Sequence, residues 1–387
     1  MTVITNIDDL KRLYQRRVPR MFFDYTESGS WTEQTFRDNS EDFSHIKLRQ
    51  RVGVDMTGRS TKSSMVGQEV SMPVALAPVG LTGMQCADGE IKAARAAAGF
   101  GVPFTLSTMS ICSIEEVAAH ATPGFWFQLY VMRDQEFVES LVGRARDAGC
   151  RALVLTLDLQ ILGQRHKDLK NGLSVPPRPT FGNLLNLSTK LRWGMGMLAT
   201  KRKKFGNIIG HARGVTDTGS LMEWTANQFD QSLDWKRVVA IKRLWGGPLI
   251  LKGILDVEDA RRAADIGADA IIVSNHGGRQ LDGAMSSIRM VSRIAQAVGG
   301  SVEIHFDSGI RSGQDVLKAL AMGAHATYIG RSYIYGLGAM GEKGVRSALE
   351  VIHKELDFTM ALCGKTDVTE LSRSDLFLPA DFETAWN

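Results

Sequence analysis

Residues 274–283 read SNHGGRQLDG and hold the densest group of side chains that could do chemistry. His276 can exchange a proton near neutral pH, and Arg279, three residues later, can hold a carboxylate through two parallel hydrogen bonds. The two glycines between them allow the backbone to turn sharply. The segment therefore indicates proton transfer on a carboxylate-bearing substrate, although a structural turn whose histidine caps a helix remains open.

Three other segments carry charge at or just after the end of an apolar run. Lys252 ends the run LILK, where a lysine inside a protein needs an anionic partner. It could offset negative charge on a cofactor, form a Schiff base, or pair with Asp158, and the residues alone leave all three open. HFDSGIRSG and IGRS combine glycines with Arg311 and Arg331, as phosphate sites do. Ordinary turn glycines are the alternative there.

Short, continuously apolar runs precede these side chains, and such runs predict parallel strands covered on both faces. We expect eight strands, at Val74–Ala77, Phe104–Ser107, Trp126–Tyr130, Ala152–Leu157, Leu249–Lys252, Ala270–Ser274, Val302–Phe306 and Ala326–Gly330. Helical patterns follow most of them, at residues 89–98, 113–120, 134–148, 257–266, 286–298 and 312–322. This alternation predicts an α/β fold of the (β/α)8 TIM-barrel type.

In such a barrel the carboxyl ends of all strands meet at one face, where catalytic groups gather. Polar side chains end nearly every predicted strand, among them Ser107, Gln128, Thr156, Ser274 and Asp307. One shared site at that face is therefore expected.

Two regions fall outside the repeat. Residues 1–70 predict an N-terminal helical cap, whose residues 48–67 read as irregular chain leading into the barrel of residues 71–387. The second region is a long insertion after strand four, between Asp158 and Pro248. Within it, residues 177–211 (the basic insertion) hold seven Lys or Arg and no Asp or Glu, beside many apolar side chains. Its KRKK run alone would contribute about 4 kcal/mol to binding an anionic membrane.

Composition limits the alternatives. The chain has 387 residues, of which 44% are hydrophobic and 23% charged, as in packed globular proteins and not in disordered or coiled-coil chains. Four scattered cysteines and the lack of a close Asp/His cluster predict reduced thiols and no metal site. No apolar run is long enough to cross a bilayer, and no secretory signal is expected. A single basic run is weak ground for nucleic-acid binding.

One glycine motif matches the pattern of a dinucleotide-binding site but lies in the wrong context. GLGAMG, residues 336–341, spells the GxGxxG of dinucleotide-binding proteins. A true fingerprint opens a βαβ unit directly after a strand, whereas this one follows the last predicted strand at a distance. We therefore reject it as a dinucleotide site.

On these residues the chain resembles the FMN-dependent α-hydroxy-acid dehydrogenase and oxidase family, over about residues 5–375. SNHGGRQLDG matches that family's specific signature, and SMPVALAPVGLTGM, PFTLST, WFQLYV and GPLILKGILD are similar as well. Within the family, the likeness is closest to the bacterial, quinone-linked branch that oxidises L-lactate.

The resemblance implies a barrel that binds FMN at its C-terminal face. His276 would be the catalytic base and Asp158 would orient it. The substrate would be held by Arg165, Arg279, Tyr25 and Tyr130. The cofactor would be bound by Pro78, Val79, Gly80, Ser107, Gln128, Thr156 and Ser274 around its ring, by Lys252 at its N1/O2 edge, and by Asp307, Ser308, Gly309, Arg311, Gly330 and Arg331 along its ribityl phosphate.

The implied reaction is oxidation of L-lactate, or a similar small L-2-hydroxy acid, to the 2-oxo acid, with electrons passing from FMN to a quinone. An oxidase that makes hydrogen peroxide is the alternative, because Met109 and Gly80 depart from residues common in parts of the family and leave oxygen reactivity and substrate preference open. A non-catalytic phosphate-binding barrel is a third possibility, but a binder needs no base such as His276.

The basic insertion suggests where the protein works. We expect it to dock the enzyme peripherally on the cytoplasmic side of the inner membrane, where reduced FMN would meet quinone. A solvated active-site loop is the alternative. The family resemblance also implies a homo-oligomer, with a tetramer expected.

Overall fold

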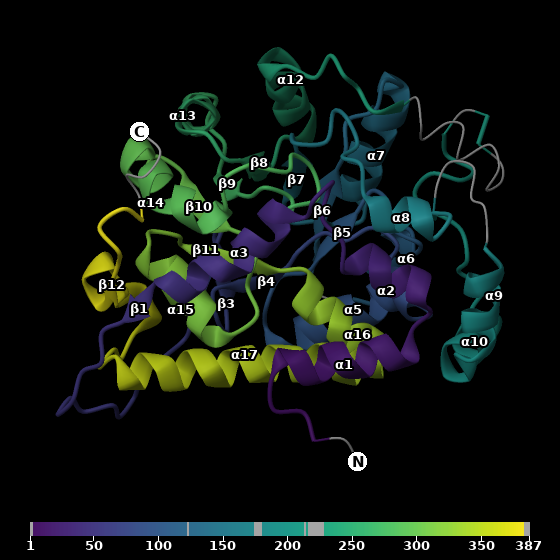
Figure 1. Ribbon diagram of the computed structural model, residues 1–387. Coiled ribbons are helices and arrows are strands. Elements are labelled where there is room, and N and C mark those ends of the chain that lie inside the picture. The colour runs from purple at the N-terminus through teal and green to yellow at the C-terminus, as the bar shows by residue number, and fades with distance from the viewer. Residues whose placement is uncertain (1–2, 122–123, 174–179, 213, 216–227, 383–387) are drawn as a thin grey trace.

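A closed ring of eight parallel strands lies at the centre of the computed structural model, which describes residues 3–121, 124–173, 180–212, 214–215 and 228–382 (Figure 1). The strands are β4 (Val74–Leu76), β5 (Thr105–Ser107), β6 (Trp126–Leu129), β7 (Leu153–Thr156), β8 (Leu249–Ile254), β9 (Ala270–Val273), β10 (Glu303–Phe306) and β11 (Ala326–Ile329). Their residues are almost all buried because helices cover the outside and side chains fill the inside.

The strand order shows how the ring closes. Strands β5 to β11 pair in sequence order, β11 pairs with β4, and a parallel bridge between Leu76 and Phe104 joins β4 to the start of β5. The predicted (β/α)8 barrel is confirmed, with strand ends within one or two residues of those expected. Strand β8 is longer than predicted and shifts register between Lys252 and Ile254.

The helices that the periodicity predicts after the strands are present, as α5 (Gly89–Phe100), α6 (Ile114–Ala118), α7 (Gln135–Asp147), α13 (Val257–Asp265), α14 (Ser287–Val298) and α15 (Gly313–Ala321). The structure adds three helices that the periodicity did not predict, α12 (Trp235–Trp245), α16 (Arg331–Met340) and α17 (Glu342–Leu362). Side-chain caps start several of them: Asp134 and Ser312 accept backbone N–H bonds, and Ser113 with Glu116 forms a capping box.

The N-terminal region is helical, as predicted, but it also contains strands. Helices α1 (Ile7–Arg17), α2 (Arg20–Thr26) and α3 (Gln34–His45) are followed by β1 (Lys47–Leu48), which pairs with the C-terminal β12 (Leu376–Phe377). Two 3-10 turns, Val368–Glu370 and Arg373–Asp375, precede β12.

The expectation of irregular chain over residues 48–67 is wrong at its end. A hairpin of β2 (Ser63–Met65) and β3 (Gln68–Val70) turns at Val66 and Gly67, both with positive φ. Met65 and Val70 are buried against the barrel interior, so the hairpin covers the base of the barrel. Three-residue strands are too short to show an alternating pattern, which is why the sequence did not reveal them.

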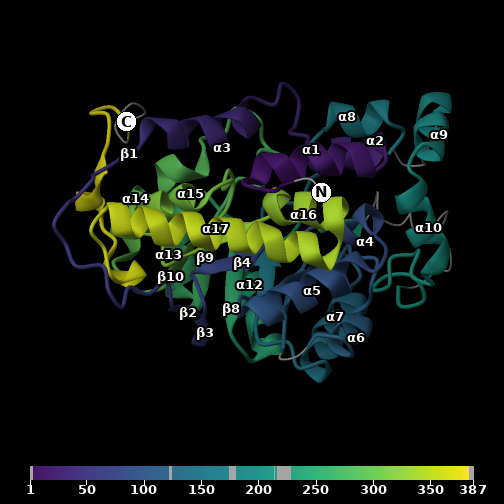
Figure 2. The ribbon, with the colours of Figure 1, turned by 90° about the horizontal axis from the view of Figure 1, so that it is seen from below.

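The rejected GxGxxG motif is a helix-packing device. Gly336 and Gly338 lie inside α16, and a β-carbon on Gly336 would come within 2.2 Å of the Gly344 carbonyl oxygen on α17. A β-carbon on Gly338 would meet the Tyr14 ring of α1 at the same distance. The three helices lie side by side (Figure 2), and only glycine permits so close an approach.

The long insertion holds short helices that its sequence does not predict: α8 (His166–Lys170), α9 (Phe181–Ser188) and α10 (Leu191–Ala199). Helices α9 and α10 lie together at one edge of the molecule, and α8 lies further in, beside α2 (Figure 1). Another short helix, α4 (Thr82–Gln85), follows β4. Among the described residues, no helix has the length and apolar character needed to cross a membrane.

Candidate active site

A cavity of about 540 Å³ opens at the carboxyl ends of the strands. Most of the predicted site residues line it: Tyr25, Pro78, Val79, Gly80, Tyr130, Arg165, Lys252, His276, Arg279, Asp307, Ser308, Gly309, Arg311, Gly330 and Arg331. The others are not part of its lining: Ser107, Gln128, Thr156 and Ser274 are buried, and Asp158 is partly buried. The structure therefore brings side chains from all parts of the chain to one place.

His276 and Asp158 form a hydrogen-bonded pair, with His276 Nδ1 2.9 Å from Asp158 Oδ1. This contact leaves Nε2 as the ring nitrogen available to the cavity. Burial lowers the pKa of His276, although the neighbouring Asp158 acts in the opposite direction. Burial alone would raise the pKa of Asp158, but the attraction of His276 and Lys252 lowers it. The site thus holds a neutral imidazole beside a carboxylate, the state in which a histidine can take a proton.

The turn that carries His276 is fixed by residues far away in the sequence. His276, Gly277 and Gly278 all have positive φ, between 58° and 72°. Asn275 exchanges two amide hydrogen bonds of 2.8 Å with Asn39 on α3 and also accepts the Gly278 N–H. A β-carbon on Gly278 would lie 2.5 Å from the backbone of α3. Sequence reasoning missed Asn39 and Asn275, because nothing in their own surroundings marks the pairing.

The position of Asp158 depends on two further residues that the sequence analysis did not single out. Gly253, at the register shift in β8, has a φ of +98°, and a β-carbon there would lie 2.6 Å from the Asp158 carboxyl carbon. Gln280 donates to the carbonyl oxygens of Asp158 and Ile161 at 2.7 and 2.8 Å. Glycine therefore makes room for the carboxylate, and glutamine holds the loop behind it.

Lys252 is a buried ammonium on the cavity floor, with only 4% of its side chain exposed. Its Nζ lies 3.0 Å from Asp307 Oδ2 and donates to Ser274 Oγ at 2.9 Å. Burial would lower the pKa of Lys252, but Asp307 and Asp158 raise it. Lys252 therefore pairs with Asp307 and not with Asp158, as one of the three possible roles required. Its raised pKa also disfavours a Schiff base, because that reaction needs a neutral amine.

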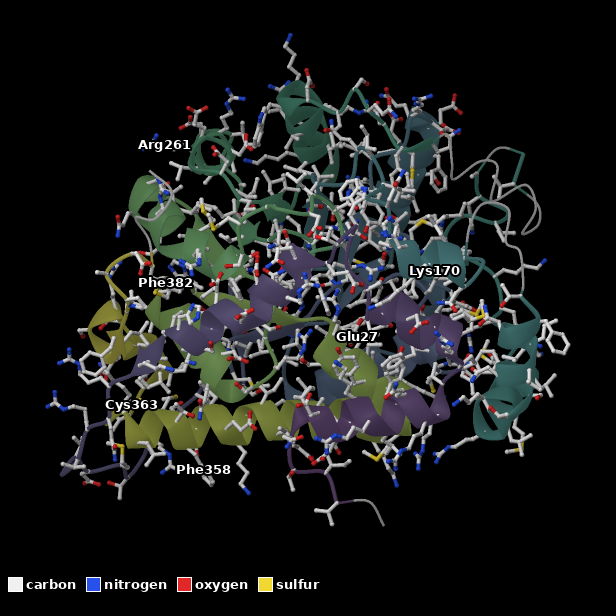
Figure 3. All side chains as sticks on the ribbon, viewed as in Figure 1. Glu27, Lys170, Arg261, Phe358, Cys363 and Phe382 are labelled. Atoms are coloured by element: carbon white, nitrogen blue, oxygen red, sulfur yellow. The ribbon has the colours of Figure 1, made fainter. Side chains whose placement is uncertain are left out.

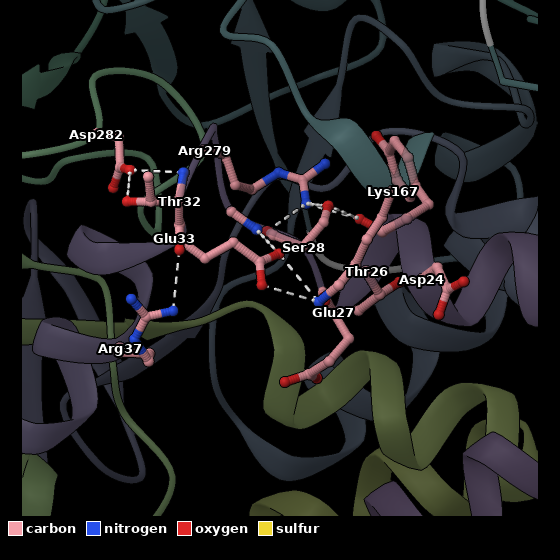
Figure 4. A network of polar contacts seen from close by, with 12 residues as sticks. Asp24, Thr26, Glu27, Ser28, Thr32, Glu33, Arg37, Lys167, Arg279 and Asp282 are labelled. Carbon is pink, nitrogen blue, oxygen red and sulfur yellow. Dashed lines mark hydrogen bonds and ion pairs between the residues drawn. The ribbon is translucent and has the colours of Figure 1, made fainter. Parts of the chain in front are cut away.

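Two guanidinium groups flank the ring of Tyr25. Arg279 lies 4.8 Å from the ring centroid and donates to the carbonyl oxygens of Tyr25 and Ser28 (Figure 4). Arg165 lies 5.9 Å from the same centroid and pairs with Asp168 at 2.6 Å. Burial and then the charge of Arg165 lower the pKa of Arg279. Two buried like charges at one wall favour an anion between them.

The cationic wall continues from Arg279 to Arg331, since both guanidinium groups donate to the Ser28 carbonyl. Burial and the charges of Arg311 and Arg279 lower the pKa of Arg331 to about 10. Glu27 is a nearby carboxylate, labelled beside α16 in Figure 3. It already forms an ion pair with Lys11 at 2.8 Å, so its charge does not balance that of the two arginines. Gly309 has a φ of +95°, and a β-carbon there would meet the Asn39 carbonyl at 2.0 Å. Glycine backbone beside two arginines is the donor set of a phosphate site.

Beneath the cavity, three buried polar side chains form one chain of hydrogen bonds. Ser107 Oγ donates to Gln128 Oε1 at 3.0 Å, and Gln128 Nε2 donates to Thr156 Oγ1 at 3.0 Å. The role expected for them, lining a flavin ring, stays a prediction.

The cavity wall also contains apolar residues that the sequence analysis did not propose, among them Met21, Phe22, Leu159, Leu162, Phe205 and Phe229. An apolar wall suits a flat aromatic ring system, Lys252 suits negative charge at its edge, and the arginine and glycine end suits a phosphate. The residues present therefore fit FMN. Fold and site together define a (β/α)8-barrel flavin oxidoreductase.

The chain belongs to the FMN-dependent dehydrogenase family, whose model matches residues 14–378. It is 45% identical over 380 residues to an L-lactate dehydrogenase of Caulobacter vibrioides, covering 97% of this chain and 98% of that protein. It is 45% identical over 377 residues to an L-lactate dehydrogenase of Pseudomonas aeruginosa, with the same coverage.

Solved structures agree with this assignment. A structure described as the monotopic membrane protein (S)-mandelate dehydrogenase matches with a TM-score of 0.93 and 34% identity, covering 97% of this chain and all of that one. A mandelate oxidase matches with a TM-score of 0.82 and 36% identity, covering 97% and 98% of the two chains. The resemblance drawn from SNHGGRQLDG is confirmed, and the protein is an FMN-dependent dehydrogenase.

Proposed function

We propose that this enzyme oxidises L-lactate, or a similarly small L-2-hydroxy acid, to the corresponding 2-oxo acid. The observation that carries the proposal is one cavity in which the neutral His276, held by Asp158 at 2.9 Å, shares space with Arg165, Arg279 and the ammonium of Lys252. The relatives named L-lactate dehydrogenase, similar over nearly the whole chain, support the substrate.

FMN, when bound, supplies the two-electron acceptor that no side chain can provide. The substrate carboxylate binds between Arg165 and Arg279, which fixes the α-carbon in the cavity. His276 Nε2 takes the proton that leaves the substrate, whether the electrons leave as a hydride or after carbanion formation. Asp158 stabilises the imidazolium that results. Lys252 offsets negative charge at the cavity floor.

The two tyrosines complete the substrate site. Tyr25 lies beside both arginines, and Tyr130 lines the same cavity, with its pKa raised by burial and by the charge of Asp158. The Tyr130 phenol therefore stays protonated, and both tyrosine hydroxyls can donate hydrogen bonds to substrate oxygens. Apolar side chains such as Leu159 and Phe229 exclude water from the reacting atoms.

A substrate panel tests the proposal. Anaerobic mixing of the flavin-loaded enzyme with L-lactate should bleach the flavin absorbance, whereas D-lactate should not. Glycolate and (S)-mandelate test the limits of side-chain size, since mandelate enzymes share the fold. Bleaching by (S)-mandelate but not by L-lactate would move the proposal to aromatic hydroxy acids, and no bleaching by any 2-hydroxy acid would refute it.

We further propose that the electrons pass to a quinone at the membrane and not to oxygen. Helices α9 and α10 support membrane docking because they expose large apolar side chains, with Phe181 82%, Leu191 74% and Leu198 80% exposed. Phe205, from the same insertion, lines the cavity, so the insertion connects this surface with the site. A peroxide assay with L-lactate, with and without a quinone analogue, separates the two acceptors; peroxide formation at the full turnover rate would favour the oxidase.

The charges of the KRKK run contribute less than its sequence suggested. Lys201, Lys203 and Lys204 are exposed, but Arg202 forms ion pairs with Asp88 at 3.0 Å and Glu116 at 2.8 Å. Three lysines rather than four cations remain for an anionic surface, worth about 3 kcal/mol together. We propose peripheral attachment to the cytoplasmic side of the inner membrane, in which the apolar side chains of α9 and α10 add to this term.

A further inference from the structure

A polar column runs through the inside of the barrel below the active site. Glu303, His305 and Asp307 alternate along β10, so all three point inward. Asp307 lines the cavity and holds Lys252, His305 is fully buried, and the side chain of Glu303 is 32% exposed. Asp307 serves the reaction indirectly by holding Lys252, whereas His305 and Glu303 have no role in the mechanism above.

His305 links the cavity to the base of the barrel through two hydrogen bonds. Its Nε2 lies 3.1 Å from Glu303 Oε2, and its Nδ1 lies 3.2 Å from the hydroxyl of Tyr328, which itself lines the cavity. Its ring also stacks at 11° on Trp126. Glu303 additionally accepts the Val66 N–H of the β2–β3 hairpin at 2.9 Å.

These contacts set the direction of the hydrogen bonds. Burial would raise the pKa of Glu303, but the bonds from His305 and Val66 lower it, so Glu303 is a carboxylate and accepts. Nε2 of a neutral His305 must then carry the hydrogen, and Nδ1 must accept from the Tyr328 hydroxyl. The hydroxyl hydrogen of Tyr328 is thereby turned away from the cavity.

Opposing effects on the pKa of His305 keep its ring neutral, and a new charge nearby can change their sum. Burial lowers the pKa of His305, Glu303 acts against that, and His325 adds to it. Apolar side chains such as Ile250 and Ile272 surround the column inside the barrel. The cavity floor adds the ion pair of Asp307 and Lys252, and the charge of Asp307 acts on Tyr328. In such a low-dielectric interior, one added negative charge at the cavity floor shifts a neighbouring pKa strongly.

We propose that His305 is a redox-linked protonation site, which takes up one proton when FMN bound above the barrel is reduced. The imidazole gains a proton from solvent and becomes an imidazolium; no electrons pass through it. Nε2–H then donates to Glu303 and Nδ1–H donates to the Tyr328 oxygen, so the Tyr328 hydroxyl is free to turn toward the cavity and donate to the new negative charge. His305 acts through Tyr328 and is a positioning residue.

The pH dependence of the flavin midpoint potential tests this proposal. Reduction by light or dithionite makes the test independent of the substrate, so it rests on FMN binding but not on the proposed lactate reaction. Between the His305 pKa values of the oxidised and reduced enzyme, one extra proton per two electrons should steepen the slope by about 30 mV per pH unit. His305→Gln keeps both hydrogen bonds but cannot take the proton, and should lose the extra slope.

Two variants complete the design. Tyr328→Phe should weaken the extra slope, because it removes the hydrogen bond between His305 and the cavity. His353→Gln is the matched control: this histidine bonds Thr61 on the outside of the barrel and should leave the slope unchanged. Equal slopes in the wild type and His305→Gln, with normal flavin spectra in both, would overturn the proposal.

Proton counting provides a second measurement that needs no variant. Photoreduction of the wild-type enzyme in weakly buffered solution should take up one proton more, within the same pH window, than it does well above that window. An uptake that stays constant across this range would refute the proposal even if His305→Gln failed to fold. Failure of the substrate panel with a normal proton count would refute only the lactate reaction.

Discussion

The catalytic imidazole lies in a backbone conformation that most residues avoid. His276 has a φ of 58°, and the structure holds it there through the Ser274 hydroxyl and the Asn275 amide beside it. Asparagine tolerates this left-handed region better than alanine does. A substitution that is meant to remove only the base should therefore use a residue that also tolerates this positive φ.

We expect His276→Asn to leave FMN bound and the protein folded while the rate of flavin reduction by L-lactate falls by about 10²–10⁴. Stopped-flow absorbance measures this rate, and the visible spectrum before mixing reports the bound flavin. A rate near that of the wild type would show that another group takes the proton.

Asp158 should control both the rate and its pH dependence. Because burial lowers the pKa of His276 from its usual value, kcat/KM should fall only as the pH drops through that lowered pKa and the imidazole becomes protonated. Asp158 raises the pKa of His276, so Asp158→Asn should move this acid limb to lower pH and also reduce kcat, since the imidazolium loses its partner. An acid limb that moves to higher pH would contradict this arrangement.

At this scale the sequence revealed the reactive side chains better than their supports. His276 and Arg279 are conspicuous because two glycines separate them directly after a strand, and Lys252 because a lysine ends an apolar run. Gln280 and the Asn39–Asn275 pair are ordinary polar residues in the sequence, and their role depends on partners more than one hundred positions away. Only the folded chain shows such pairing.

At the scale of elements, strands and helices of the barrel follow from local pattern. Strands buried on both faces must be continuously apolar, and helix caps such as Ser113 and Asp134 mark where each turn ends. The bulge at Gly253 has no such signal, because the need for glycine there comes from Asp158 on the neighbouring strand end. The helices α9 and α10 were missed because their apolar side chains face outward and not toward a core.

We expect Gly253→Ala to displace Asp158 and reduce turnover by at least tenfold, in addition to the cost of about 1–3 kcal/mol for a non-glycine residue at this φ. Gly283→Ala is the control, because Gly283 has a similar φ of +81° but open space around it. Urea unfolding and kcat measured together separate strain from displacement. Equal effects of both substitutions on kcat would show that the clash with Asp158 does not matter.

The exposed apolar side chains of α10 predict that this helix binds the membrane surface. Replacing Leu191 and Leu198 with Asp should abolish sedimentation of the enzyme with vesicles that contain anionic lipid, while turnover with a soluble acceptor stays unchanged. Leu362→Asp provides the control, because Leu362 is 62% exposed at the end of α17, away from the insertion. Loss of vesicle binding in the control alone would place the contact on another face.

At the scale of the whole molecule, the basic insertion packs directly against the wall of the catalytic cavity. Trp193 on α10 donates to the Met84 carbonyl at 2.8 Å and packs on Phe22 at 5.7 Å, and both of these residues line the cavity. A membrane that held α10 would therefore also hold part of the cavity wall. The fold class, the shared site and the family were predictable from sequence, whereas this connection was not, because it joins segments that share no motif.

The contacts between the helical cap and the catalytic turn have a practical consequence. Asn39 bonds Asn275, Thr32 and Thr35 bond Asp282, and Arg279 is held by carbonyls of the cap. Dividing the chain just before the first barrel strand would therefore separate the helical cap from the turn that carries His276. The turn would then lose the hydrogen bonds that hold it. Circularly permuted or split versions should keep residues 20–45 with the last third of the chain, even though more than two hundred codons separate them.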